Sequence, residues 1–244
     1  MRLPRFRFTL RRMMILVVGT ALIVALVAEQ TKLAVRDARA YEASADDAKA
    51  KRDYVRALSL YTEAIRLDPT NGSLRRRRGS TWVHLKQYHE AITDYTEAIR
   101  LNPKDDLAYL SRSYWRKAFK EYDEAIADST EAIRLDPKDG MAYTMRGDAW
   151  VEKVEYTKAM ADYEEGIRLD PNYADAYAGR GFTRAKQGRH DEAMADYEKA
   201  IRLDPKSGLP YYLRGQSWKD LGDLVKAKSD FDEAARLDPE MVAK

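Results

Sequence analysis

The sequence of 244 residues contains no cysteine, which excludes a disulfide framework, a zinc site built from thiolates and a cysteine nucleophile. Glycine and proline are scarce, with 12 and 8 residues, whereas 34% of the residues are charged. This composition argues against a collagen-like or disordered chain and favours a helix-rich body. Only three histidines are present, and His84 and His89 are not spaced as the pair of a helical zinc motif.

The body of the chain also lacks an excess of basic charge. Five arginines and no acid lie in residues 1–12: Arg2, Arg5, Arg7, Arg11 and Arg12. The other 38 of the 43 basic residues face 40 acidic residues, so residues 13–244 carry a net charge of −2. Broad binding of nucleic acid through phosphate neutralisation is therefore not expected.

Residues 13–28 form a run of sixteen uncharged, mostly apolar residues directly after this basic segment. As a helix the run would span about 24 Å, against a bilayer hydrocarbon core of about 30 Å. Cleavage after Ala28 would place Leu26 where signal peptidase prefers a small residue. We therefore expect an uncleaved membrane anchor, with a cleaved signal peptide and a buried soluble helix as alternatives.

Charge around this run predicts its orientation. The excess of positive charge in residues 1–12 should keep that tail in the cytoplasm and place the rest of the chain across the membrane. Between Gly19 and Gly72 the sole proline or glycine is Pro69, so helix can continue from the membrane into the body. Residues 29–37 are then a helical stalk, or alternatively a frayed linker.

The rest of the chain repeats with a period of 34 residues. A Leu-Asp/Asn-Pro step recurs with its proline at Pro69, Pro103, Pro137, Pro171, Pro205 and Pro239. With this proline at the thirty-second position, the body covers residues 38–241. The repeats are residues 38–71, 72–105, 106–139, 140–173, 174–207 and 208–241.

Each unit carries two apolar stripes at helical spacing. Tyr143, Gly147 and Trp150 form one such stripe, and Ala91, Tyr95 and Ala98 form the other kind. Small residues that alternate with rings allow two helices to approach closely. Because the Asp-Pro step ends the second helix, each unit is predicted to be a helix–turn–helix.

This pattern resembles the tetratricopeptide repeat (TPR) family. The order of ring, small residue, ring, ring, alanine, ring and proline typical of that family is present in Tyr143, Gly147, Trp150, Tyr156, Ala159, Tyr163 and Pro171. The resemblance implies an all-α fold, a TPR-type α-solenoid in which antiparallel helix pairs form a right-handed superhelix behind the N-terminal transmembrane helix. It also implies a binding platform for proteins, with no catalytic residues, cofactor or metal.

The last unit is predicted to cap the array. The twenty-first and twenty-eighth positions are apolar in the first five units and should face the next repeat. In the sixth unit they are Lys228 and Ala235, and only Glu240 to Lys244 follow the final proline. Terminal repeats need such an outer face for solubility, so the array should end here.

Two charged columns accompany each other through the repeats. The seventh and twenty-third positions of repeats 2 to 6 are always an arginine and an aspartate: Arg78, Arg112, Arg146, Arg180 and Arg214 with Asp94, Asp128, Asp162, Asp196 and Asp230. Repeat 1 lacks both. We expect the arginine and the aspartate of each repeat to pair between its two helices. The alternative is that both are solvent-exposed and were inherited together when the repeats duplicated.

Candidate binding residues follow by elimination. The fifth, ninth and twelfth positions lie beside the core stripe of each first helix, and by TPR resemblance they line a concave groove. These positions in repeats 2 to 6 are Arg76, Ser80, Val83, Leu110, Tyr114, Lys117, Thr144, Asp148, Val151, Ala178, Phe182, Ala185, Tyr212, Gln216 and Lys219. Large apolar residues among them suggest a site for an extended peptide or helix, although they alternatively support neighbouring repeats.

The residues of TPR domains that clamp a C-terminal carboxylate are not reproduced in any three consecutive units. The basic run Arg75–Arg78 is a second candidate, for phosphate or a peptide carboxylate. We expect a membrane-anchored scaffold that binds a protein or peptide partner, with no nucleic acid and no small-molecule substrate. The alternative is a structural protein of the envelope that self-associates into homo-oligomers through the repeats.

Overall fold

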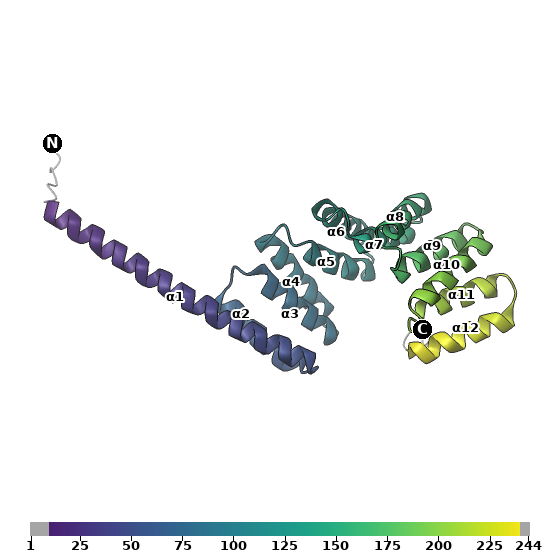
Figure 1. The fold of residues 1–244 in the computed structure, drawn as a ribbon, viewed down its shortest axis with the longest axis horizontal. Helices are drawn as coiled ribbons and strands as arrows, with labels where there is room; N and C mark the ends of the chain where they lie inside the picture. Colours follow the sequence, from purple (N-terminus) through teal and green to yellow (C-terminus); the bar gives the residue numbers. More distant parts are fainter. Residues whose placement is uncertain (1–9, 240–244) are drawn as a thin grey trace. The chain divides into compact units, whose positions relative to one another are not determined.

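The computed structural model describes the backbone of residues 10–239 and the side chains of residues 17–239, and the regular structure in this part is entirely helical (Figure 1). Met1 to Thr9, most of the expected cytoplasmic tail, and Glu240 to Lys244 lie outside the described residues. The helices in chain order are α1 Leu10–Ala50, α2 Tyr54–Leu67, α3 Gly72–His84, α4 Tyr88–Leu101, α5 Asp106–Ala118, α6 Tyr122–Leu135, α7 Gly140–Glu152, α8 Tyr156–Leu169, α9 Ala174–Lys186, α10 His190–Leu203, α11 Leu209–Asp220 and α12 Leu224–Leu237.

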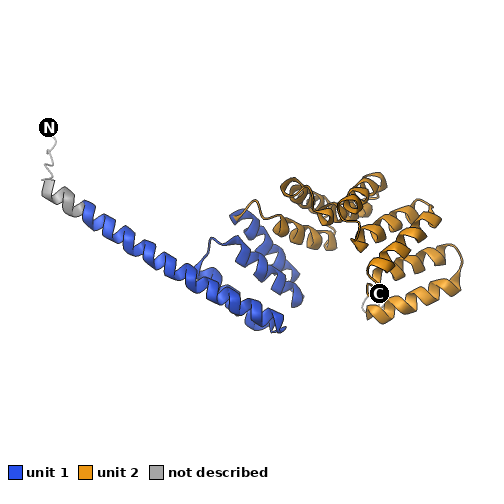
Figure 2. Cartoon of the chain, in the orientation of Figure 1, with its two compact units in different colours: residues 1–101 blue, residues 102–244 orange. Residues whose placement is uncertain are grey.

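The helices form two compact units, residues 1–101 and residues 102–244 (Figure 2). The first unit contains repeats 1 and 2, in which α1 packs on α2 and α3 packs on α4. The second contains repeats 3 to 6, with the pairs α5–α6, α7–α8, α9–α10 and α11–α12. The helix boundaries match the predicted 34-residue repeats, so the all-α helix–turn–helix prediction is confirmed.

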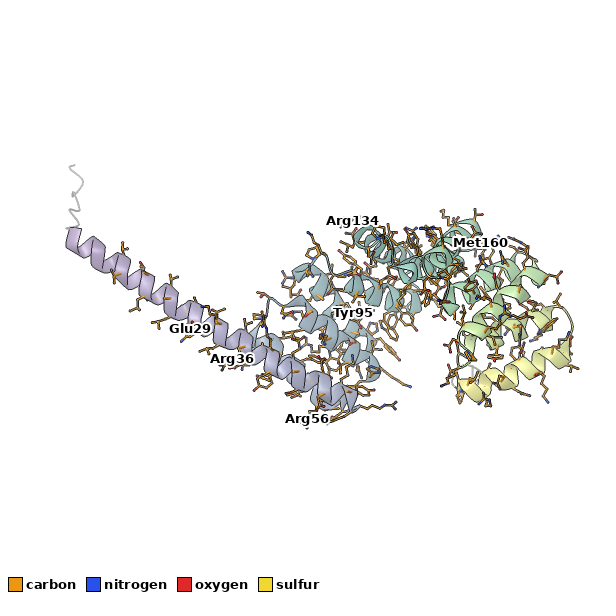
Figure 3. The ribbon with its side chains drawn as sticks, viewed as in Figure 1. Glu29, Arg36, Arg56, Tyr95, Arg134 and Met160 are labelled. Carbon is orange, nitrogen blue, oxygen red and sulfur yellow. The ribbon has the colours of Figure 1, made fainter. Side chains whose placement is uncertain are left out.

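Helix α1 is one continuous helix of 41 residues. It includes the described part of the apolar run, residues 29–37 and the whole first helix of repeat 1, so the predicted unbroken stalk is present. Its N-terminal part projects from the other helices of the first unit (Figure 2), and Glu29 lies on this projecting part (Figure 3). Within the described residues, one helix is apolar and long enough to cross a membrane; its most apolar window has a mean hydropathy of 1.5 and is 0% buried.

The turn inside each repeat uses a left-handed residue at the fifteenth position. Gly188 and Gly222 hold this position in the last two repeats, with φ of 78° and 83°. Repeats 1 to 4 place Arg52, Lys86, Lys120 and Val154 there, with φ between 59° and 65°. A β-branched valine is disfavoured in this region, so Val154 stores strain in the turn of repeat 4.

The core is built from small residues packed on rings, as the stripes predicted. A Cβ atom placed on Gly79 would lie 2.8 Å from Tyr95 Cε1, and one on Gly181 would lie 2.8 Å from Tyr197 Cε1. The ring of Tyr95 lies among the packed helices of the first unit (Figure 3) and is 2% exposed. These contacts leave no room for a larger residue on the first helix, which fixes how closely the two helices of a repeat approach.

The outer face of α12 is polar where other second helices are apolar. Lys228 is exposed, whereas Leu58 and Ile99, on the corresponding stripe of earlier repeats, are each 9% exposed. This exposure agrees with the predicted capping role of the last repeat.

All five predicted arginine–aspartate pairs form, and each is bidentate. In repeat 4, Arg146 donates its Nε to Asp162 Oδ2 at 2.9 Å and its Nη2 to Asp162 Oδ1 at 2.7 Å. The other four pairs have the same two bonds, at 2.7–3.0 Å. The aspartates are 3–6% exposed, so the pairs lie between the helices and the pairing prediction is confirmed.

Two of these aspartates hold a second arginine. Arg116 and Arg184 occupy the eleventh position, which is a tryptophan in repeats 2, 4 and 6 and Ala48 in repeat 1. Arg116 Nη1 lies 2.8 Å from Asp128 Oδ2, and Arg184 Nη1 lies 2.7 Å from Asp196 Oδ2. Both departures from the repeat pattern therefore extend the charged column.

Candidate functional site

The second unit contains a hollow of about 430 Å³ on the side formed by its first helices. Helices α5, α7, α9 and α11 supply nearly all of its wall, so the hollow extends over repeats 3 to 6. Its lining is mainly apolar and aromatic with a few charged groups: Tyr114, Lys117, Thr144, Met145, Asp148, Val151, Glu152, Tyr163, Tyr173, Asp175, Gly179, Phe182, Leu209 and Leu213. A concave, mostly apolar site with few polar groups is typical of a binding pocket.

Six of the residues proposed from the sequence lie in this wall: Tyr114, Lys117, Thr144, Asp148, Val151 and Phe182. Tyr114 is 50% exposed. Its ring centroid lies 5.0 Å from that of Trp115 and 6.0 Å from Lys117 Nζ, both on the same helix. Half of the surface of Tyr114 is therefore open to a partner, whatever support the ring gives to its neighbours.

The other proposed residues of the second unit lie elsewhere. Leu110 is 4% exposed and Ala178 is 0% exposed, so neither side chain is accessible to a partner. We therefore exclude both from the candidate site. Tyr212 packs its ring 5.7 Å from that of Phe231, and its hydroxyl accepts a bond of 2.9 Å from Gln216 Nε2. Tyr212 therefore packs within its own repeat, and it does not line the hollow. Ala185 and Lys219 do not line the hollow.

In the first unit the corresponding positions are Arg76, Ser80 and Val83, and the neighbouring charges pair with one another. Lys49 Nζ donates to Ser80 Oγ at 2.6 Å. Arg77 lies 2.7 Å from Asp46 Oδ2 and 3.1 Å from Glu42 Oε1. Arg78 pairs with Asp94. Two of the four arginines in Arg75–Arg78 are thus paired with acids of the chain itself, which weakens the prediction that this run binds phosphate.

Asp148 is held rigidly at the centre of the hollow. Its Oδ2 accepts a bond of 2.5 Å from Lys117 Nζ on α5, and its Oδ1 accepts one of 2.8 Å from the Tyr163 hydroxyl on α8. Burial, followed by the charge of Asp148, raises the pKa of Tyr163 well above its usual value, so the hydroxyl stays protonated and donates. Residues of two neighbouring repeats therefore meet on one carboxylate.

The ring of Tyr163 lies directly against Gly179. A Cβ atom on Gly179 would lie 2.5 Å from Tyr163 Cε1 and 2.8 Å from its hydroxyl oxygen. The other repeats of this unit place Ser111, Met145 and Leu213 at the same sixth position. The bond to Asp148 does not itself require a glycine, because Tyr61 makes the same bond to Asp46 in repeat 1, where Arg77 holds the sixth position of the next repeat. Gly179 leaves open space in the wall of the hollow beside this ring.

Eight of the fourteen wall residues were not among those proposed from the sequence, and two of the eight, Tyr173 and Asp175, differ in type from the residues at the same positions of other repeats. Tyr173 stands at the thirty-fourth position, where the preceding repeats have the helix-capping residues Asn71, Asp105 and Asp139. Asp175 stands at the second position, which is Leu107, Met141 and Leu209 in the other repeats of this unit. Burial and then the charge of Asp148 raise the pKa of Asp175, while Tyr173 and Lys117 oppose this. The departure of both positions from the repeat pattern was the available signal.

The histidines do not form a catalytic or metal-binding group in the described part of the chain. His84 stacks on Tyr54 with ring centroids 4.4 Å apart, and His190 Nδ1 is buried without a hydrogen-bond partner. No three histidine, aspartate or glutamate side chains of residues 17–239 are grouped as a metal site.

The sequence matches models of the tetratricopeptide repeat over residues 42–106, 174–207 and 210–241, and a model described as a TPR repeat over residues 147–188. These matches and the twelve described helices define a TPR α-solenoid. The chain belongs to the tetratricopeptide repeat family. No curated protein matches it.

Solved structures share this fold. TTC0263, a thermophilic TPR protein of Thermus thermophilus, is 20% identical, with a TM-score of 0.64 over 69% of this chain and 92% of that one. The pilF protein of Pseudomonas aeruginosa is 17% identical, with a TM-score of 0.68 over 84% and 94%. YrrB, described as a TPR protein with an unusual peptide-binding site, is 21% identical, with a TM-score of 0.52 over 75% and 95%. At these identities the likeness shows the fold alone.

Proposed function

We propose that the chain is a membrane-anchored scaffold that holds a segment of a partner protein in the hollow of its second unit. The observation that carries this proposal is the half-exposed ring of Tyr114, which faces the same hollow as Phe182. Burying such rings against a partner removes apolar surface from water, and aromatic residues dominate the energetics of many interfaces. A peptide-binding site in YrrB agrees with this class of partner.

The hollow is suited to binding because its polar groups are already fixed. Asp148 is restrained by Lys117 and Tyr163, so little side-chain freedom remains to be lost when a partner binds. Lys117 and Tyr163 are both hydrogen-bonded to Asp148, which suits a fixed binding surface. We propose a binding role without enzymatic activity.

We further propose that α1 anchors the chain and that residues 38–241 lie on the extracytoplasmic side. Because α1 is continuous, the ten helical steps from Ala28 to Ala38 separate the membrane surface from repeat 1 by about 15 Å. A protease added to sealed membrane vesicles of known orientation should digest the repeats only from the extracytoplasmic face. Digestion from the cytoplasmic face alone would contradict this topology.

Partner binding can be tested by replacing both rings that line the hollow. The double variant Tyr114→Ala/Phe182→Ala should lose partner capture after crosslinking in intact membranes, while its helical signal by circular dichroism stays unchanged. Val55→Ala on α2, where the side chain is 71% exposed and outside the hollow, serves as the control and should keep full capture. Equal capture by the folded double variant and the control would remove the hollow as the binding site.

A second function is favoured by one observation. Leu221 in the turn before α12, and Leu224 and Val225 in the first turn of α12, are apolar side chains with 49%, 66% and 83% of their surface exposed. Apolar side chains exposed in this way favour self-association of the chain. Light scattering on the full chain in detergent micelles should then show oligomers that Leu224→Ser/Val225→Ser dissociates, whereas a strict monomer excludes this function.

A further inference from the structure

We infer that the hollow accepts an arginine or lysine side chain from an otherwise apolar segment of the partner, and that Asp175 is its counter-ion. This inference rests on the proposed function, because it names the chemistry of the segment that the hollow binds.

The charge of the wall selects a cation. Three acidic side chains, Asp148, Glu152 and Asp175, line the hollow together with one basic side chain, Lys117. Lys117 is bound to Asp148, so this pair contributes no net charge. The hollow therefore has two acidic charges in excess, from Glu152 and Asp175, and an acidic or C-terminal segment would be repelled from it.

Asp175 and Glu152 are the two acids of the wall for which the structure shows no salt bridge among the described residues, whereas Asp148 has Lys117 at 2.5 Å. Glu152 accepts a hydrogen bond from the Tyr122 hydroxyl at 3.2 Å. Asp175 is exposed, so a partner can reach its carboxylate, and partial burial and the charge of Asp148 raise its pKa. A guanidinium or ammonium group from a partner would supply the missing charge.

The aromatic part of the wall suits the same side chain. Tyr114, Phe182 and Tyr173 line the hollow together with the acids, and the faces of such rings attract cations as well as alkyl groups. An arginine or lysine side chain combines an apolar stem with a charged head, so the stem can lie on the rings while the head reaches Asp175. Leu209 and Leu213 on α11 provide apolar surface for the flanking residues of the segment.

The inference is tested with a defined probe, a displayed library of random peptides of about twelve residues, enough for one segment of a partner. The full chain in lipid nanodiscs is used to select binders, and selected peptides are then measured by fluorescence anisotropy. We expect the selected peptides to share an arginine or lysine between apolar residues. Asp175→Asn should weaken their binding about tenfold, which is the loss expected for one charged contact at an interface.

A matched control and a neutral peptide separate charge from structure. Asp106→Asn removes an acid from the first turn of α5, as Asp175→Asn does from the first turn of α9, but it lies outside the hollow and should leave affinity unchanged. Replacing the basic residue of the peptide by an uncharged analogue, citrulline for arginine or glutamine for lysine, should weaken binding to the unmodified chain. The same replacement in the peptide should weaken binding to the Asp175→Asn variant little further.

The outcomes distinguish this inference from the proposed function. Selected peptides that are neutral or acidic, and that depend on Phe182 but not on Asp175, would overturn the inference and leave the hollow as a binding site. Binding of free arginine as tightly as of the peptides would also overturn it, since the ligand would then be a small molecule. Selected peptides whose affinity is unchanged by Phe182→Ala and Tyr114→Ala would overturn the proposed function itself.

Discussion

Breaking the Arg146–Asp162 pair of repeat 4 should destabilise the chain, and the two single substitutions should not be additive. Asp162 is 6% exposed and accepts both guanidinium bonds, whereas 21% of the Arg146 side chain is exposed. Replacing either residue by alanine leaves the other charge unpaired between the helices, at a cost of about 3 kcal/mol, the lower end of the range for a buried pair because Arg146 keeps some solvent.

The double variant leaves no unpaired charge, so its loss should be close to that of one single variant. We expect the sum of the single losses to exceed the double loss by about 2 kcal/mol, which is within the range of coupling measured for contacting residues. The coupling arises because the second substitution removes a charge that the first has already left without a partner.

The assay is urea unfolding of the full chain in detergent micelles, followed by circular dichroism and by the fluorescence of the tryptophans, among them Trp150 in the same repeat. The surface pair Glu165–Arg168 in α8 provides a matched control with a contact of 2.5 Å, and it should show no measurable coupling. Strictly additive losses for Arg146→Ala and Asp162→Ala would refute the reasoning that these charges hold the two helices in register.

Three further predictions concern stability. Val154→Gly should stabilise the chain by about 1 kcal/mol in the same urea assay, because glycine adopts the positive φ of this turn without strain; a loss of stability would contradict the strain assigned to Val154. Gly181→Ala should cost about 1–3 kcal/mol because the new Cβ would lie 2.8 Å from the Tyr197 ring, and an unchanged midpoint would show that the ring can move. Asp175→Asn should not reduce stability at neutral pH. The raised pKa of Asp175 means that its ionised form is disfavoured in the folded state, so the unmodified chain should gain stability relative to the variant as pH falls through that pKa; the opposite trend would refute the shift.

The repeat pattern predicted the fold well because a period of 34 residues constrains every unit in the same way. The Asp-Pro step located the end of the second helix, and the joint presence of Arg146 and Asp162 with their counterparts predicted a contact that the structure contains. The absence of proline and glycine between Gly19 and Pro69 likewise predicted that α1 is unbroken.

The same periodicity predicted only part of the hollow: six of its wall residues lie at the proposed positions, and the others do not. Tyr114, Phe182 and Tyr212 are equivalent as large apolar residues beside the core stripe, yet Tyr212 packs on Phe231 while the other two line the hollow. Which of these rings lines the hollow depends on contacts in three dimensions that a repeat pattern does not contain. Asp175 was missed because it lies outside the three positions that the family resemblance implied.

The most direct test of the account is photo-crosslinking from single positions in intact membranes. A benzophenone amino acid in place of Tyr114 should give a discrete adduct with a partner protein, and this adduct should disappear when Phe182→Ala is added. The same amino acid in place of Val55 on α2, which is exposed outside the hollow, should not give that adduct. An adduct of the same mass from Val55, or one from Tyr114 that persists in Phe182→Ala, would contradict the claim that the hollow holds the partner.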